Sequence, residues 1–396
     1  MSQTKPGSAT RRLPASSSLL LDVVRFGAAV MVAFGHVTQE FFSTGWPNLT
    51  LYAVEAVGVF FVLSGFVIRY VTRMKYARIG EYWIDRASRM YSVVIPAILF
   101  TLFADGLTKH IDAGYYLANW GKYTDHPVSR LVQNLLFTSQ FWSRSTRLFS
   151  NGPLWSLSYE CLYYAIYGCA FYLRGPLRWI AVIGLIVLGG PHIAFLLPLW
   201  LLGCGLYEIY AWLVTQGRSG SGFRRARVHL GFAAVAVLGI ALWQPASNAC
   251  YLAYMGITHL LVAHQHHPVE VFWLMRFYYR VGLPAAFLML WALVAIDGVQ
   301  VNAKARWVRS VRVLAEGTFP LYVVHFPLFV LISALVPYDH GNPVPKLAML
   351  LAAIAFGVLL ASPTNRIKDA MRNRLRNWFL PGDRMPAARS AETVAT

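Results

Sequence analysis

The chain has 396 residues, of which 57% are hydrophobic and 13% are charged. A soluble globular domain carries about 25% charged residues, so this composition excludes an ordinary soluble multi-domain enzyme. Its 35 Lys and Arg residues outnumber its 17 Asp and Glu residues, which gives a net charge of +18. In so apolar a chain this surplus is typical of basic cytoplasmic loops rather than of a nucleic-acid-binding surface. The composition therefore predicts an integral membrane protein without a nucleic-acid partner.

The cysteines and histidines do not indicate a disulfide framework or a metal site. The four cysteines lie in or beside apolar runs without paired spacing, at positions 161, 169, 204 and 250. The cluster of His259, His264, His266 and His267 resembles a metal site in composition only, since no carboxylate or cysteine pattern accompanies it. We therefore expect no bound metal.

Apolar runs long enough, or nearly long enough, to cross a bilayer recur along the whole chain. The first is too long for a cleaved signal peptide and contains Asp22, Arg25 and His36. In chain order the runs are Leu19–Phe41, Leu51–Tyr70, Met90–Leu107, Leu157–Leu173, Leu177–Gly190, Ile193–Val214, Val228–Trp243, Tyr251–His264, Val269–Ile296, Gly317–Val336 and Leu347–Ala361.

Basic connections set the expected orientation. Arg11 and Arg12 precede the first run, and the connections at 68–89, 216–227 and 302–312 are rich in Lys and Arg, so all of these are placed in the cytoplasm. An even number of crossings must then separate 216–227 from 302–312, although three apolar runs lie between them. We expect the short run Tyr251–His264 to be re-entrant or interfacial. An all-α protein of about ten transmembrane helices results, with both termini cytoplasmic.

This topology divides the chain into three parts. Residues 1–18 form a cytoplasmic segment, residues 19–362 the transmembrane domain, and residues 363–396 a basic cytoplasmic tail with no further soluble domain. The tail is typical of an amphipathic helix that lies on the inner leaflet of the cell membrane. The connection at about 108–154 is the only sizeable extracytoplasmic segment, and its aromatic residues suit an interfacial or substrate-facing cap.

The first run carries ionisable residues at membrane depth, where each is costly and indicates function by default. Arg25 and His36 are 11 residues apart, which on a helix is a net rotation of about 20° and a rise of about 16.5 Å. The two side chains therefore share one face, with Arg25 near the cytoplasmic side and His36 near the outer side. A lone buried histidine is usually a hydrogen-bonded packing residue, but the aligned arginine argues against that interpretation here.

Two carboxylates are expected at about the depth of His36. Glu55 and Glu160 each lie about four residues inside their runs from the outer end, roughly 6–8 Å below the boundary. A histidine beside a carboxylate is the arrangement of a general base held in one tautomer. For Glu55 an interfacial carboxylate that reaches water is an equal alternative.

Two further positions have a functional and a structural interpretation. Arg86 and Arg89 stand three residues apart where a run begins, so their guanidinium groups can clamp phosphates, whereas the neighbouring basic residues are explained by orientation alone. His325 lies two residues before Pro327, which cannot donate a backbone hydrogen bond. His325 either lines the same cavity as His36 or satisfies a backbone carbonyl that Pro327 leaves free.

Taken together, the motifs resemble the membrane-bound acyltransferase family three, the multi-span O-acetylases of bacterial cell-surface polysaccharides. The segment from Leu21-Asp22 through Arg25 to His36 is similar to the first-helix signature of that family, and Arg86-Ala87-Ser88-Arg89 to its cytoplasmic Arg-x-x-Arg. Three more segments match in order: Phe60–Phe66, Trp155–Glu160 and Tyr322–Pro327. The resemblance covers about Leu20 to Ala361, although relatives often have an acidic residue where Gly58 stands and a proline where Ser92 stands.

The resemblance implies an O-acyltransferase that uses acetyl-CoA, or another acyl-CoA, as co-substrate and holds no permanent cofactor. The acceptor would be a hydroxyl of a cell-surface or lipid-linked saccharide that arrives from the outer side. We expect His36 to be the general base, with Glu160 or Glu55 orienting it, while an acyl-histidine intermediate is the competing mechanism. Arg25, Arg86 and Arg89 would bind the donor, and the residues expected to line the cavity are Ser64, Trp155, Ser158, Tyr322 and His325.

A transporter or flippase of a lipid-linked glycan is the alternative from another class. A polar stripe with polar ends on both sides of the membrane is equally typical of such a protein. The absence of a clear internal repeat in the sequence disfavours it, and a membrane assay with labelled acetyl-CoA separates the two functions.

Overall fold

The computed structural model describes residues 12–45, 47–76, 78–142, 145–217, 228–236, 239 and 268–380, without the side chains of 215–217 and 268–276. The run expected at Tyr251–His264 lies outside these residues, as do Cys250, the histidines at 259–267 and residues 237, 238 and 240–243 of the run expected at Val228–Trp243.

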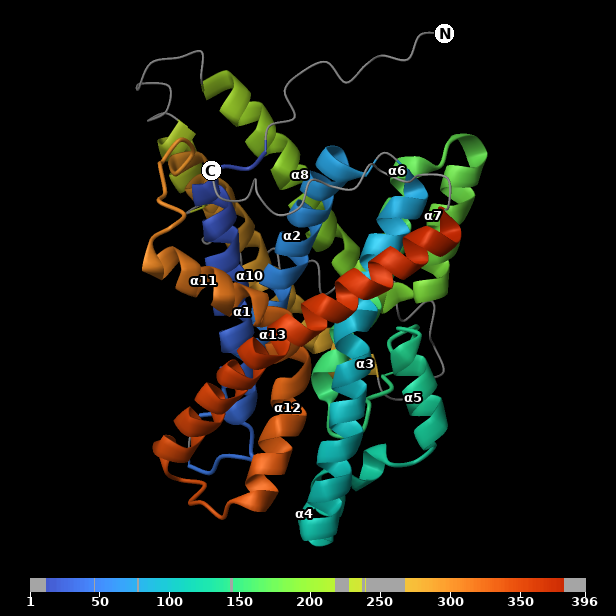
Figure 1. The fold of residues 1–396 in the computed structure, drawn as a ribbon, viewed down its shortest axis with the longest axis vertical. Coiled ribbons are helices and arrows are strands. Elements are labelled where there is room, and N and C mark those ends of the chain that lie inside the picture. The colour runs from blue at the N-terminus through green and yellow to red at the C-terminus, as the bar shows by residue number, and fades with distance from the viewer. Residues whose placement is uncertain are drawn as a thin grey trace.

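The described part of the chain is α-helical and contains no β-strand. Helices satisfy every backbone hydrogen bond within one segment, as the hydrocarbon core of a bilayer demands. In chain order they are α1 (Ala15–Val37), α2 (Thr50–Lys75), α3 (Ile79–Ile111), α4 (Ala113–Trp120), α5 (Pro127–Leu135), α6 (Trp155–Tyr172), α7 (Gly175–Gly189), α8 (Pro191–Gly217), α10 (Pro268–Ala295), α11 (Arg306–Glu316), α12 (Thr318–Leu335) and α13 (Pro343–Phe379) (Figure 1).

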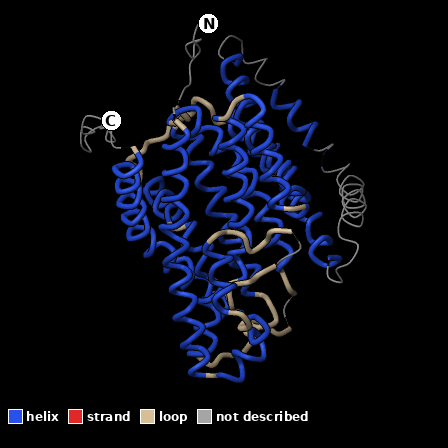
Figure 2. Tube along the Cα trace, turned by 90° about the vertical axis from the view of Figure 1, so that its right-hand side faces the viewer, coloured by secondary structure: helices blue, strands red, loops and turns tan. Residues whose placement is uncertain are grey.

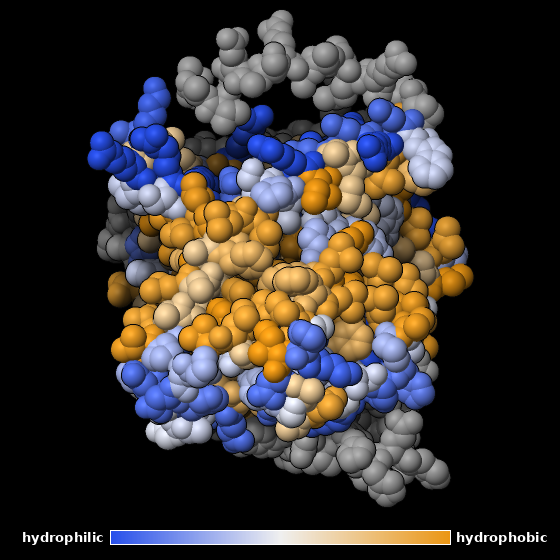
Figure 3. All heavy atoms as spheres, turned by 60° about the horizontal axis from the view of Figure 1, so that its bottom comes forward, coloured by the Kyte–Doolittle hydropathy of each residue, from blue (hydrophilic) through white to orange (hydrophobic). Residues whose placement is uncertain are grey.

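The surface and the helix lengths confirm an all-α polytopic membrane protein. Among the described residues, seven helices are long and apolar enough to cross a membrane, namely α1, α2, α3, α8, α10, α12 and α13. Large apolar side chains lie exposed on their outer faces, including Leu99 at 61% and Leu359 at 72% exposure. Figure 3 shows this on one face as an apolar belt between two hydrophilic edges. Such a belt is the surface that lipid tails cover.

Two helices hold the described bundle together. α2 packs against α1, α8 and α10, and α12 packs against α1, α3 and α13. Because α1 contacts both, the first helix lies where the two groups of helices meet, and its polar stripe faces α12. We call the end of the bundle at residues 76–78 the α2–α3 side, and the opposite end, at α4, the α4 side (Figure 1).

Residues 112–154 form a cap on the α4 side, so the expected loop begins four residues later than 108 because α3 continues to Ile111. In Figure 2 the loops of the cap gather at one end of the molecule. Asp105 of α3 anchors the cap: it accepts hydrogen bonds from Ser150 N at 3.0 Å, Ser150 Oγ at 2.5 Å and the Tyr116 hydroxyl at 3.1 Å. Trp120, the last residue of α4 in the cap, is fully buried.

The tail expected from residue 363 is not a separate helix. α13 runs without interruption from Pro343 to Phe379 and passes through Pro363. Prolines are tolerated inside such helices, and here the helix emerges from the apolar bundle and crosses over the start of α3 (Figure 1). We call residues 364–379 the α13 extension.

Glycines allow α2 and α8 to approach closely. A Cβ atom added to Gly65 would lie 2.0 Å from the Trp200 carbonyl oxygen, and one added to Gly203 would lie 2.0 Å from the Val62 carbonyl oxygen. Each glycine thus faces the backbone of the other helix. Small residues at such a crossing are the usual means of close packing between membrane helices.

Replacing Gly203→Ala therefore forces α2 and α8 apart and is expected to lower the free energy of unfolding by about 1–3 kcal/mol or more. Thermal unfolding in detergent measures the effect. Gly205→Ala on the same helix is the matched control, since no atom lies within 4 Å of its added Cβ, and it should change stability by no more than about 1 kcal/mol. Equal melting temperatures for the two variants would contradict the close crossing.

Candidate functional site

Two histidines meet inside the bundle, where the α4-side half of α1 packs against α12. The distance from His36 Nδ1 to His325 Nε2 is 2.8 Å, and the two rings stack with their centroids 5.1 Å apart. His325 is fully buried, whereas His36 remains partly exposed. The pair therefore has one inner ring and one ring that a reactant can reach.

The hydrogen bonds of the pair determine where its protons lie when both rings are neutral. His325 Nδ1 lies 3.0 Å from the Leu321 carbonyl oxygen. Because a carbonyl only accepts, His325 Nδ1 carries a proton and its Nε2 is an acceptor. His36 Nδ1 must then donate to that nitrogen, which leaves His36 Nε2 without a proton. The arrangement presents the lone pair of His36 Nε2 as a base.

The backbone carbonyl that Pro327 leaves free is satisfied by the cap, not by His325. A proline at 327 cannot donate to the Val323 carbonyl oxygen four residues earlier. Asn151 Nδ2 donates to that oxygen at 2.9 Å and also to Thr101 Oγ1 at 2.8 Å. The sequence left two alternatives for His325. The one in which His325 satisfies the carbonyl left free by Pro327 is wrong, because Asn151 binds that carbonyl and His325 Nε2 bonds to His36.

Aromatic and cationic side chains surround the exposed edge of His36. Phe326 lies edge-on to His36, with ring centroids 5.5 Å apart, and the Arg147 guanidinium carbon lies 4.9 Å from the centre of the same Phe326 ring. Phe42 packs on Phe326 at 5.5 Å and connects it to the buried Trp120. The cap thus brings the charge of Arg147 near the histidine pair, and Trp120 of the cap completes an aromatic wall with Phe42 and Phe326.

A cavity of about 380 Å³ leads from the α2–α3 side towards this pair. It follows α6 from Ser156 to Tyr164, a helical rise of about 12 Å. The Tyr322 hydroxyl, held by Ser156 Oγ at 2.7 Å, closes its inner end together with Phe60. The Tyr322 and His325 rings are 6.3 Å apart. The cavity therefore ends one aromatic ring short of the histidines, and we call it the main cavity.

A polar belt crosses the mostly apolar wall of the main cavity. Ser64 Oγ donates to Glu160 Oε1 at 2.9 Å, and the Tyr164 hydroxyl donates to the same oxygen. Trp200 Nε1 in turn donates to Ser64 Oγ at 3.2 Å. The belt offers hydrogen-bonding groups halfway along a narrow apolar passage, an arrangement that suits an extended chain with amide groups.

The end of the main cavity on the α2–α3 side is cationic. We call this end the cationic rim, and its members are Arg25, Lys75, Arg86 and Arg89. Arg86 is already paired, since its Nη2 donates to Asp85 Oδ2 at 2.5 Å and to the Tyr76 hydroxyl at 3.2 Å. Burial raises the pKa of the Tyr76 hydroxyl, which stays protonated and donates to Asp85 at 2.6 Å. The two arginines expected to form a clamp therefore differ, because Asp85 neutralises Arg86.

Arg89 has no such partner. Its guanidinium makes no hydrogen bond or ion pair with any residue in the described part of the chain, and its carbon lies 5.9 Å from the centre of the Phe319 ring. Arg25, on the opposite wall, lies 3.7 Å from its counterion Asp22. The cationic rim consequently contains uncompensated positive charge beside a passage, which favours an anionic ligand.

Comparison with known proteins identifies the family. A family model described as an acyltransferase domain, that of acyltransferase family 3, matches residues 19–365. The chain belongs to this acyltransferase family. A curated protein of Shigella phage Sf6 described as an O-acetyl transferase is 26% identical over 200 residues, 46% of this chain and 56% of that protein. The chain thus spans about half the length of this relative, and no solved structure matches it.

The family motifs come together around the main cavity. Arg25 of α1, Ser64 of α2, Arg86 and Arg89 of α3, Glu160 of α6 and Tyr322 of α12 all line it. The motifs are up to 297 residues apart in the sequence, counted from Arg25 to Tyr322, and α12 supplies the surface that joins them.

The expected carboxylate partners of His36 lie elsewhere. Glu160 bonds within the polar belt, and Glu55 faces α10, where Arg280 Nε is 3.5 Å from its carboxylate. A similar position along the bilayer normal places residues at one depth but does not determine which neighbour they face. The structure therefore gives His36 a second histidine, not a carboxylate, as its Nδ1 partner.

Three residues expected to line the cavity do not line it. Trp155 packs on Tyr278 of α10, with ring centroids 5.7 Å apart, and Ser158 is 2.9 Å from Ser139 of the cap. His325 lies behind Tyr322, against His36. Helix periodicity explains the first two, since α6 turns Ser156 and Glu160 towards the cavity and its other faces towards α10 and the cap.

Sequence reasoning missed Asp105, Asn151 and Arg147, which form the link between the cap and the histidine pair. Asp105 sits near the end of an apolar run and gave a usable signal, because a carboxylate there requires partners. Asn151 and Arg147 lie in a connection without periodicity, where their contacts depend on tertiary structure alone.

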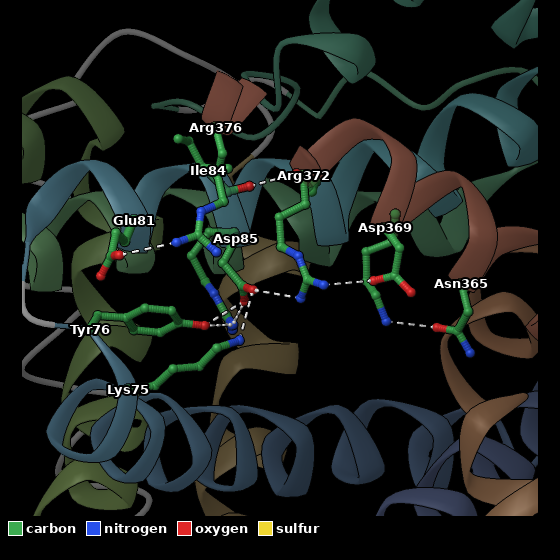
Figure 4. Close-up of polar contacts among 12 residues, drawn as sticks. Lys75, Tyr76, Glu81, Ile84, Asp85, Asn365, Asp369, Arg372 and Arg376 are labelled. Atoms are coloured by element: carbon green, nitrogen blue, oxygen red, sulfur yellow. Dashed lines mark hydrogen bonds and ion pairs between the residues drawn. The ribbon is translucent and has the colours of Figure 1, made fainter. Parts of the chain in front are cut away.

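The α13 extension lies beside the start of α3, where its arginines face Asp85 and Glu81 (Figure 4). Arg372 Nη1 lies 3.8 Å from Asp85, and Arg376 Nη2 lies 3.5 Å from Glu81. These contacts enclose a groove of about 170 Å³ that shares Lys75, Tyr76 and Asp85 with the main cavity. Two basic residues of the tail, Arg372 and Arg376, are therefore ion-paired to the start of α3, in addition to any contact with lipid.

Replacing Arg372→Gln together with Arg376→Gln should loosen the α13 extension. Each such ion pair contributes about 0.2–1 kcal/mol, so losing both should accelerate amide hydrogen exchange of residues 369–379 by about twofold to thirtyfold. Mass spectrometry in detergent measures the exchange. Arg366→Gln with Arg374→Gln, two exposed positions on the same helix, is the matched control, and equal exchange in the two double variants would contradict the anchoring.

Proposed function

We propose that this chain is a membrane O-acyltransferase that transfers an acetyl group from acetyl-CoA to a hydroxyl of a cell-surface or lipid-linked saccharide. Family membership supports the acyl-transfer chemistry. The observation that carries the proposal is the His36–His325 hydrogen bond, which leaves His36 Nε2 unprotonated. The Tyr322 ring separates the histidine pair from the inner end of the main cavity.

The main cavity suits acyl-CoA as the donor. The phosphates of coenzyme A carry several negative charges and need the cationic rim, where Arg89 is free to bind them. The pantetheine arm is an extended chain with two amides, which fits a narrow apolar passage with a polar belt. The thioester would then lie at the Tyr322 end. Because coenzyme A is a cytosolic compound, we infer that the α2–α3 side of the bundle lies on the cytoplasmic face of the cell membrane.

The chemistry needs one proton acceptor. His36 Nε2 removes the proton of the acceptor hydroxyl while that oxygen attacks the thioester carbonyl carbon. A carbon–oxygen bond forms, the carbon–sulfur bond breaks, and the coenzyme A thiolate takes the proton back from His36. His325 acts through His36 as a positioning residue, since it keeps the Nδ1 proton in place.

The acceptor would approach from the α4 side, beneath the cap. Phe326 lies edge-on to His36, and the buried rings of Phe42 and Trp120 pack behind Phe326, so these rings form a fixed apolar wall beside the base. Arg147 stands beside them and is placed to stabilise negative charge on the carbonyl oxygen during transfer.

The central test is a pair of histidine variants. His36→Ala should lower the rate of acetyl transfer by about 100-fold or more, because the general base is lost. His325→Ala should lower kcat by about tenfold or more and change the pH profile, since His36 loses its fixed tautomer. Membranes are supplied with [14C]acetyl-CoA, and both label in the glycan and glycolipid fractions and release of the coenzyme A thiol are measured.

The control is His110→Ala, an exposed histidine at the end of α3, which should leave the rate unchanged. Retained activity in His36→Ala would contradict the assignment. Export of a glycan without any incorporated label would instead favour the transporter. Label bound covalently to the protein in wild type and absent in His36→Ala would replace direct transfer by an acyl-histidine intermediate.

The free guanidinium of Arg89 generates a second prediction. Arg89→Ala should raise the KM for acetyl-CoA by roughly tenfold with little change in kcat, because a charge-assisted bond to a donor phosphate is lost. Arg78→Ala, outside the cavity lining on the same connection, is the comparison and should leave the KM unchanged. A fall in kcat at unchanged KM would contradict a role in donor binding.

A further inference from the structure

A second cavity adjoins the main cavity on the far side of Arg25 and Arg89. It has a volume of about 310 Å³, and we call it the polar chamber. α1, α3, α11, α12 and α13 all contribute to its lining. Arg25, Arg89 and Phe319 line both cavities and form the wall between them. The polar chamber is therefore next to the cationic rim, and it adds α11 and α13, which do not line the main cavity.

The polar chamber is lined by four cations. Arg312 of α11 and Lys368 of the α13 extension join Arg25 and Arg89 there. Two carboxylates also line it, Asp22 and Glu316, so positive charge is in excess. In the sequence, membrane orientation accounts for the charge of Arg312, and contact of the tail with lipid accounts for that of Lys368.

The available counterions do not neutralise this charge. Asp22 is shared, since it binds Arg312 and lies 3.7 Å from Arg25. Arg89 has no ion pair within the described chain, and Lys368 Nζ donates to the neutral Asn365 side chain at 2.9 Å. Three guanidinium groups and one ammonium group thus line the polar chamber with two carboxylates, Asp22 and Glu316, of which Asp22 is shared by two arginines. Such an arrangement favours an anion with several acceptor oxygens.

We propose that the polar chamber binds a phosphate monoester, and that this group is the 3′-phosphate of the coenzyme A donor. The assignment rests on the proposed function. The diphosphate of the donor would then lie at the cationic rim, and Arg25 and Arg89 in the shared wall would contact both anionic groups.

The lining argues for the donor over a lipid headgroup. A phospholipid phosphate needs an adjoining apolar groove for its acyl chains, whereas the polar chamber is walled mostly by charged and polar side chains and continues into the donor cavity. The phosphate chemistry is the same for both sources, so the experiment must separate them.

The test compares acetyl-CoA with acetyl-dephospho-CoA, which differs only by lacking the 3′-phosphate. The wild-type protein should have a KM for acetyl-CoA that is lower by roughly tenfold. Arg312→Gln with Lys368→Gln should remove this preference by raising the KM for acetyl-CoA, with no change in the KM for acetyl-dephospho-CoA. Lys368→Gln alone should give part of the effect, and it retains the Arg312 bond to Asp22.

Arg309→Gln with Arg366→Gln is the matched control, since it removes exposed cations from the same two helices outside the polar chamber. It should keep the wild-type preference. An unchanged preference in the Arg312 and Lys368 variants would overturn the proposal. So would an equal loss with both donors that depends on the anionic lipid content of reconstituted vesicles, which would assign the chamber to a lipid headgroup.

A binding measurement separates this proposal from the proposed function. Adenosine 3′,5′-bisphosphate should raise the melting temperature of the wild type and of the control more than ADP does, and should lose this advantage in the Arg312 and Lys368 double variant. If the wild type transfers no acetyl group but still discriminates these nucleotides, the proposed function fails and the phosphate site stands. Equal stabilisation by both nucleotides in the wild type would overturn the phosphate site.

Discussion

The hydrogen bond between His36 and His325 is the contact on which the organisation of the site depends. It joins the first helix to α12. α12 also carries Tyr322, which lines the main cavity, and the Leu321 carbonyl, which keeps a proton on His325 Nδ1. A buried imidazole needs partners for both ring nitrogens. Here Nδ1 of His325 bonds to a backbone carbonyl and its Nε2 bonds to His36. The His36 ring therefore keeps the lone pair of its Nε2 available.

The rest of the fold keeps that contact in place. Pro327 removes a backbone hydrogen bond from α12 two residues beyond His325, and Asn151 of the cap supplies the missing donor. Asp105 fixes the turn that carries Asn151 by accepting two hydrogen bonds from Ser150. The cap is therefore part of the support of the histidine pair, and the same segment brings Arg147 to the Phe326 ring.

Much of the fold followed from the sequence because lipid imposes simple rules. Apolar runs predicted α1, α2, α3, α8 and α10 with boundaries that differ from the observed ones mainly at the ends, where α3 starts at Ile79 rather than Met90. Its polar start is held by ion pairs of Asp85 and Glu81 with neighbouring helices, which periodicity does not reveal. The same pairs explain why α13 continues past Ala361 as one helix.

The site was predictable as a set of residues but not as a set of contacts. The face shared by Arg25 and His36 followed from helix geometry, and the family motifs indicated Ser64, Arg89 and Tyr322 as neighbours. Depth alone favoured Glu160 or Glu55 as the partner of His36, yet rotation about the helix axes directs Glu160 into the polar belt and Glu55 towards Arg280. Only tertiary packing places His325 against His36.

The central claim is that His325 fixes the proton of His36 on Nδ1 and leaves Nε2 as the base. Nitrogen-15 NMR of histidine-labelled protein in detergent tests it directly, with the His36 signals assigned by their loss in His36→Gln. The account predicts a neutral His36 ring with a protonated Nδ1 and an unprotonated Nε2, and a mixture of tautomers in His325→Ala. A proton on His36 Nε2 in the wild type, or signals unaffected by His325→Ala, would contradict it.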